Sequence, residues 1–204
     1  NWEYNVALVN YILFNAEIDP TLINYQDKYY GIGFQIISQP IQFFLKNIIS
    51  NFQSIDSYGA HLLAKHFVVF ITFFISIIFV YLIISKIINN FYFSISATSL
   101  YATYPYLLGH GLFNPKDIPF LCFWVICTYI SINIFDKLLR DISLKYQDII
   151  LISFLSAFLL SIRITGALIF IQYLVTFIIF LNLKKTKFIN FFKTYLKKIL
   201  TFVF

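Results

Sequence analysis

The feature that most constrains this chain is an uninterrupted apolar run over residues 67–88, in which the first charge is Lys86. A helix rises 1.5 Å per residue and a bilayer core is about 30 Å thick, so about 20 apolar residues cross it. Only 12% of all residues are charged, about half the share usual in soluble domains, and 60% are hydrophobic. Too few polar side chains remain to cover a water-facing exterior. We therefore predict an all-α membrane protein.

Three further apolar regions follow this run along the chain. They cover residues 91–109, 118–135 and 149–183. Pro105 lies inside the first of them and is expected to bend or end its helix. The last region has 35 residues, interrupted only at 163–166. As one straight helix it would measure about 52 Å, too long for a single crossing. We therefore predict a hairpin with arms 149–162 and 167–183, which gives about five membrane helices within residues 67–183.

The charges predict the orientation of this bundle. With five crossings, the loops near residue 86, at 136–148 and at 184–198 share one face, which holds ten of the fifteen bases and three acids. The other face holds five bases and six acids. Basic loops mark the cytoplasmic side of a membrane protein. The net charge of +6 therefore indicates orientation, and we expect no nucleic-acid partner. Residues 184–204 are predicted to form a basic cytoplasmic loop and the start of a further helix.

The N-terminal residues 1–66 contain no run long enough to span a membrane and are expected at the outer face. Two stretches, 4–14 and 32–49, repeat apolar residues at helical spacing, which is typical of helices lying in the membrane interface. Lys65 and His66, directly before the first span, are expected to be interfacial anchors, with contact to a lipid headgroup as the alternative. The chain contains no Met, even at position 1, and ends in an apolar run. We therefore expect all 204 residues to be one membrane-domain fragment of a longer protein.

The loop after the second apolar region carries the strongest chemical signal. Asn114 and Pro115 interrupt the preceding helix, and Asp117 stands where the next helix begins. The carboxylate of Asp117 could simply cap this helix, or form a salt bridge with its neighbour Lys116. However, His110, Lys116 and Arg163 are predicted on the same outer face at similar depth. Two permanent cations beside a carboxylate could bind a phosphate and accept a proton.

Five short motifs, taken in order, indicate a family. They are Lys28-Tyr-Tyr-Gly31, Ala60-His-Leu-Leu-Ala-Lys-His66, Tyr104-Pro105, Asn114-Pro-Lys-Asp-Ile-Pro119 and Ser161-Ile-Arg-Ile-Thr-Gly166. This ordered set resembles the membrane glycosyltransferases of the GT-C superfamily. The branch it resembles most is the one that contains the protein O-mannosyltransferases and the lipid A aminoarabinose transferase, similar to glycosyltransferase family 39.

The resemblance implies roles for individual residues. Asp117 matches a family aspartate that opens a later membrane helix, and Arg163 stands where the family has a Lys or Arg before Gly at a hairpin. Lys28 resembles a lysine that contacts the donor phosphate, although Tyr29-Tyr30 replaces the family's prolines. The family also has a catalytic acid in its first outer loop. That acid is expected upstream of Asn1 or, within the fragment, at one of three acids: Glu3, Glu17 or Asp19.

The implied reaction is transfer of a sugar from a polyprenyl-phosphate donor to a hydroxyl of a glycan, lipid or protein acceptor. It would take place on the non-cytoplasmic side of a bacterial inner membrane or an equivalent membrane. A divalent cation requirement is left open by the resemblance, and no metal-ligand set is assigned. The competing predictions are a transporter or flippase of a lipid-linked or anionic substrate, and a membrane scaffold without catalysis.

Overall fold

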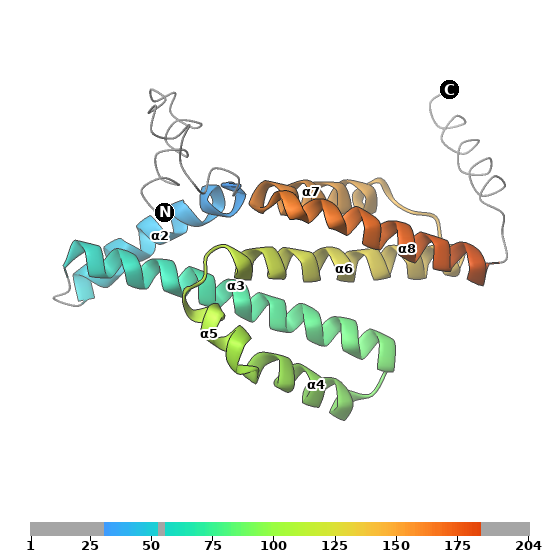
Figure 1. The fold of residues 1–204 in the computed structure, drawn as a ribbon, viewed down its shortest axis with the longest axis horizontal. Helices are drawn as coiled ribbons and strands as arrows, with labels where there is room; N and C mark the ends of the chain where they lie inside the picture. Colours follow the sequence, from blue (N-terminus) through green and yellow to red (C-terminus); the bar gives the residue numbers. More distant parts are fainter. Residues whose placement is uncertain (1–30, 53–55, 185–204) are drawn as a thin grey trace, which may run out of the picture.

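The computed structural model describes residues 31–52 and 56–184, and these fold as seven α-helices and one 3-10 helix (Figure 1). The prediction of an all-α fold is confirmed for this part of the chain. The elements are α2 (Gly33–Phe52), α3 (Ser57–Ile88), α4 (Phe91–Thr103), α5 (Pro105–Phe113), α6 (Asp117–Leu139), α7 (Tyr146–Ile162), η2 (Ile164–Ala167) and α8 (Leu168–Leu183). Three segments are long and apolar enough to cross a membrane: Ser57–Ile88, Asp117–Leu139 and Ile164–Leu183. The predicted helix at 4–14 and the segment 185–204 lie outside the described residues.

Helix α3 contains the predicted span 67–88 but begins ten residues earlier than that span. Its start is capped by Asp56, whose side chain accepts a hydrogen bond from the Gly59 N–H at 3.3 Å. Its end is marked by Asn89, which adopts a left-handed conformation with φ of 51°. The polar turns of α3, residues 57–66, thus extend the helix beyond its apolar part and carry Lys65 outside that part.

The second apolar region is divided into two helices where proline was expected to interrupt it. α4 ends at Thr103 and α5 begins at Pro105, with Tyr104 between them in a non-helical conformation. Proline disfavours the α conformation of the preceding residue, which explains this boundary. α5 then continues to Phe113, four residues beyond the predicted end, and Gly111 packs it closely against the Phe73 ring of α3.

The last apolar region is a helical hairpin in the structure. α7 ends at Ile162, Arg163 is extended, and η2 leads into α8, which returns beside α7 (Figure 1). The two arms are joined by a hydrogen bond of 2.9 Å between the hydroxyls of Ser156 and Tyr173. Gly166 allows the turn to close tightly, because a Cβ there would lie 2.9 Å from the Leu159 carbonyl oxygen.

The main core cluster lies where α2, α3, α6 and α7 meet. It consists of Phe34, Val68, Val69, Phe73, Ile118 and Ile162. Ile118 follows Asp117 in the chain, and Ile162 precedes Arg163. Packing of this cluster therefore fixes the start of α6 beside the tip of the hairpin, and both elements carry predicted site residues.

Four ion pairs gather at the opposite end of the bundle, where α3, α6 and α8 end and α7 begins. They are Lys86–Asp136 at 3.2 Å, Arg140–Asp136 at 3.0 Å, Lys137–Asp148 at 2.6 Å and Lys184–Asp141 at 2.7 Å. The structure thus brings to one end the described parts of the loops that the charge pattern assigned to one face, residues 86, 136–148 and 184. Every acid in these loops is paired with a base.

We expect the Gly166→Ala variant to unfold at a lower temperature than the wild type. The added methyl group would press on the Leu159 carbonyl in the backbone of α7, which cannot move aside as a flexible side chain would. Such overpacking costs roughly 1–3 kcal/mol. Gly109→Ala is the matched control, because nothing lies within 4 Å of a Cβ at that position. Thermal unfolding in detergent gives the midpoint temperature of each variant. Equal midpoint temperatures for the two variants would contradict the close contact between Gly166 and the backbone of α7.

Candidate functional site

The candidate site lies where the α5–α6 connection meets the hairpin tip. Asp117 is the first residue of α6, and Arg163 directly follows α7. The Arg163 Nη1 donates a hydrogen bond to the Asp117 Oδ1 and forms an ion pair across 46 positions of sequence. Their side chains are 29% and 49% exposed, so the pair lies at the surface of the described bundle. The structure therefore brings together two of the five residues predicted for the site.

Asn114 connects this pair to the start of α6. Its Oδ1 accepts hydrogen bonds from the backbone N–H groups of Lys116 and Asp117, each at 3.0 Å. Its Nδ2 donates to the Asp117 Oδ2 at 2.9 Å. The first turn of α6 is therefore capped by Asn114, and the Asp117 carboxylate is directed to other groups. The sequence analysis treated Asn114 only as a break in the chain, and the signal it missed is the Asn-x-x-Asp spacing ahead of a helix.

His110 joins the same network from α5. Its Nδ1 lies 2.7 Å from the Asn114 Nδ2, one helical turn further along the chain. The imidazole ring lies near two aromatic rings, with centroid distances of 4.3 Å to Tyr106 and 5.5 Å to Phe113. His110, Asn114, Asp117 and Arg163 thus form one continuous chain of polar contacts. Three of these four residues were predicted site residues.

Two lysines lie near the start of α6. Lys65 of α3 is close enough to Lys116 for the two charges to interact. Lys65 belongs to the polar turns of α3, before its apolar part. The position of Lys116, directly before Asp117, agrees with the predicted cluster. Lys65 was expected to be an interfacial anchor or to contact a lipid headgroup, and both stay predictions. The structure adds that Lys65 lies close to Lys116.

Arg163 also lies over the ring of Phe120, with 5.8 Å between its Cζ and the ring centroid. The chain ahead of α2 packs next to it. The Gly31 N–H donates to the Ile162 carbonyl oxygen at 3.1 Å, and both Gly31 and Gly33 lie against Ser161. Lys28, the fifth predicted residue, lies outside the described residues.

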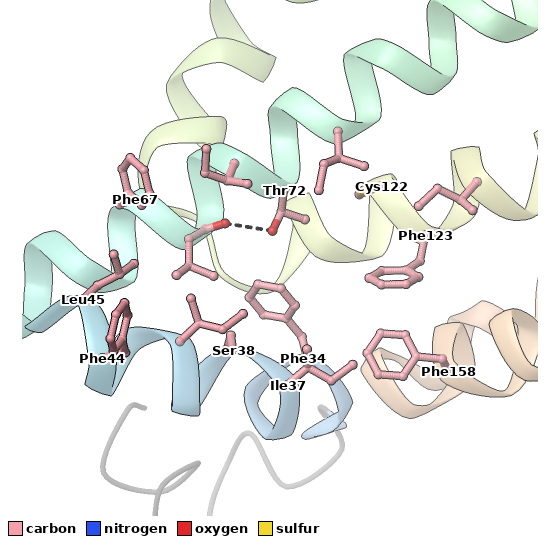
Figure 2. Close-up of a pocket in the computed structure, with 15 residues that line it drawn as sticks. Phe34, Ile37, Ser38, Phe44, Leu45, Phe67, Thr72, Cys122, Phe123 and Phe158 are labelled. Atoms are coloured by element: carbon pink, nitrogen blue, oxygen red, sulfur yellow. Dashed lines mark hydrogen bonds between the residues drawn. The ribbon is translucent and has the colours of Figure 1, made fainter.

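An apolar cavity of about 460 Å³ lies along α6 and α7, where Cys122 is five residues from Asp117 and Phe158 is five residues from Arg163 (Figure 2). It is lined by residues of α2, α3, α6 and α7, and its apolar lining is interrupted by Ser38, Thr72 and Cys122. Figure 2 shows the Thr72 hydroxyl directed back to its own helix, where it donates to the Val68 carbonyl at 2.8 Å. Phe67, two residues after Lys65, is part of the wall. The cavity therefore offers little to a polar ligand and suits a hydrocarbon chain.

The donor set of the site does not favour a metal ion. Among the described residues, no group of three His, Cys, Asp or Glu side chains is placed to hold one. Asp117 and His110 supply one carboxylate and one imidazole, whereas Mg²⁺ and Ca²⁺ take six or more ligands, mostly oxygens. The chemistry of the described site is therefore that of cations, one carboxylate and hydrogen-bond donors.

Comparisons with known proteins do not identify a relative. No protein-family model, no curated protein and no solved structure matches the chain. The resemblance to GT-C glycosyltransferases stays a prediction, and the function has to be inferred from the chemistry of the site.

We expect Asn114→Ala to destabilise the protein by about 1 kcal/mol, because the first turn of α6 would lose the side-chain acceptor of two backbone N–H groups. Asn114→Ser should retain most of the stability, since a serine hydroxyl can accept from the same groups. Thermal unfolding in detergent compares the two variants. If serine and alanine were equally destabilising, the cap would not be the role of this side chain.

Proposed function

We propose that the chain is part of a membrane glycosyltransferase that moves a sugar from a polyprenyl-phosphate donor to an acceptor hydroxyl. The observation that carries this proposal is the network around Asp117. One carboxylate is held by Arg163 and Asn114, Lys116 directly precedes it in the chain, and the lining of an apolar cavity begins five residues further along α6, at Cys122. A lipid phosphate needs both features at once, cations for its head and an apolar volume for its chain.

The proposed topology has five membrane helices, formed by α3, by α4 with α5, by α6, by α7 and by α8. The ion-paired end is basic and therefore cytoplasmic by the positive-inside rule. The site at the other end then faces away from the cytoplasm, in a bacterial inner membrane or an equivalent one. α2 would lie in the interface, since Ile37, Ile41 and Phe44 are 48%, 48% and 64% exposed. Lipid would cover these side chains.

The donor phosphate would be bound by the cations of the site. Arg163 is suited to this role because its guanidinium forms paired hydrogen bonds with phosphate oxygens. Lys116 and Lys65 would add positive charge, and Lys28 has the same role by the resemblance. The polyprenyl chain would enter the cavity, and Phe67 of α3 is one of the apolar residues that would contact it.

In the proposed reaction, the acceptor hydroxyl oxygen attacks the anomeric carbon of the sugar and forms the new glycosidic bond. The bond between that carbon and the phosphate oxygen breaks, and its electron pair leaves with the polyprenyl phosphate. Asp117 accepts the hydroxyl proton. The cations stabilise the charge that grows on the leaving phosphate, which costs little reorganisation because they are already in place. The first-loop acid of the family, upstream of Asn1 or at Glu3, Glu17 or Asp19, would take part in proton transfer.

A transporter or flippase of a lipid-linked anion is the second candidate, and one observation favours it. One proposed membrane crossing is discontinuous, because it is interrupted at Tyr104 between α4 and α5. Discontinuous helices frequently form substrate sites in transporters. Covalent transfer of label to an acceptor distinguishes the two candidates, because a flippase moves the donor without breaking it.

We expect Asp117→Asn and Arg163→Ala each to reduce sugar transfer by on the order of 10²-fold or more while the protein still inserts into membranes. The measurement is incubation of membranes containing the full-length protein with a labelled polyprenyl-phosphate sugar. Lys137→Ala is the matched control, since it breaks an ion pair of 2.6 Å at the opposite end of the bundle. Unchanged transfer in both site variants would contradict the assignment.

We expect Ile75→Trp, which narrows the apolar cavity from α3, to raise the KM for a long-chain donor about 10-fold and to leave kcat near its wild-type value. The reason is that the cavity would contact only the lipid chain, far from the reacting bonds. A donor with a short, soluble chain should show a much smaller change. If KM rose equally for both donors, the chain would not occupy this cavity.

A further inference from the structure

We infer that Asn114 is a positioning residue that fixes His110 as the Nε2–H tautomer, so that this N–H donates to a phosphate oxygen of the donor. The position of the ligand rests on the proposed function. The tautomer rests only on the hydrogen bonds of the described residues. The two parts can therefore be tested separately.

The orientation of the Asn114 amide follows from its neighbours. The backbone N–H groups of Lys116 and Asp117 are donors only, so the side-chain atom that receives both at 3.0 Å is the oxygen. The amide nitrogen then faces Asp117 and His110. Its two hydrogens match two acceptors, the Asp117 Oδ2 at 2.9 Å and the His110 Nδ1 at 2.7 Å.

This orientation determines the tautomer of the imidazole. A neutral imidazole has one N–H and one acceptor nitrogen. Because Nδ1 receives a hydrogen from Asn114, the proton of the neutral ring is on Nε2. The imidazole also contacts the rings of Tyr106 and Phe113 on the same helix. Among the described residues, no group forms a hydrogen bond with Nε2, and the N–H is available to a ligand.

The Asn114 amide also orients the Asp117 carboxylate, which accepts the proton in the proposed reaction. The Asp117 Oδ1 accepts a hydrogen bond from the Arg163 Nη1, and the Oδ2 accepts one from the Asn114 Nδ2. Each carboxylate oxygen therefore has one donor. An ionised carboxylate can accept about four hydrogen bonds. Each oxygen thus keeps a lone pair for an acceptor hydroxyl. Asn114 does not touch the reacting atoms in this arrangement, and acts by holding the two groups that do.

Nitrogen NMR of the full-length protein in lipid nanodiscs, with ¹⁵N-labelled histidine, tests the tautomer. His110→Gln identifies the His110 signals by their loss. We expect the wild type to show the Nε2–H tautomer. Asn114→Asp should convert it to Nδ1–H, because a carboxylate can only accept from the ring. A wild-type Nδ1–H tautomer, or no change in Asn114→Asp, would overturn the inference.

Asn114→Ser supplies a second test if the aspartate variant fails to fold. The serine hydroxyl keeps an acceptor for the backbone but removes both amide hydrogens. We expect a mixture of tautomers in this variant, in place of the single one in the wild type. A single Nε2–H tautomer in Asn114→Ser would show that Asn114 does not fix the ring.

The ligand part is tested with farnesyl phosphate and, as the uncharged control, farnesol. Farnesyl phosphate should shift the Nε2 signal of His110, and farnesol should not. Equal shifts, or none with the phosphate, would contradict the donor role.

In transfer assays, His110→Gln should retain activity within about 10-fold, since its amide N–H reaches the position of Nε2, and His110→Asn should lose on the order of 10²-fold. If wild-type protein transferred no sugar while the NMR results held, the proposed function would fail and the tautomer assignment would stand.

Discussion

The ion pair between Asp117 and Arg163 is the interaction on which the arrangement of the site depends. It joins the start of α6 to the turn of the hairpin, and both ends of the pair stand next to core residues. Ile118 and Ile162, 2% and 3% exposed, pack in one cluster beneath it. Apolar packing therefore sets the approach of the two helices, and the charges are held at the boundary of that packing.

The two ends of the bundle use their charges differently. At the basic end, the acids at 136, 141 and 148 are each paired with a lysine or arginine, and exposed pairs of this kind contribute little stability. At the site, Asp117 pairs with Arg163 from a distant segment of the chain, and Asn114 donates a hydrogen bond to the same carboxylate. The charged pair at the site thus belongs to a hydrogen-bond network that continues to His110.

The sequence allowed the helices to be predicted much better than the contacts between them. Lengths of apolar runs, Pro105 and the interruption at 163–166 predicted α3, the α4–α5 boundary, α6 and the hairpin, because each depends on local geometry. The pairing of Asp117 with Arg163 was only an expected proximity, since it depends on packing between distant segments. The hydrogen bonds of the Asn114 side chain were not predicted, because asparagine before proline is also an ordinary helix breaker. Lys65 was expected only as an anchor or a headgroup contact, because a hydropathy pattern does not reveal that it lies close to Lys116 from a distant segment.

The breaks in the helices and the polar site coincide for a physical reason. Backbone N–H and C=O groups at a helix end lose their partners, and lipid cannot replace them. At the hairpin turn, the Ile162 carbonyl receives the Gly31 N–H at 3.1 Å, and the Arg163 carbonyl receives the Gly166 N–H at 2.8 Å. At the start of α6, the Asn114 amide supplies the missing partner. The groups that satisfy these ends are polar and fixed in place, and the proposed reaction on a lipid phosphate would need such a fixed polar environment.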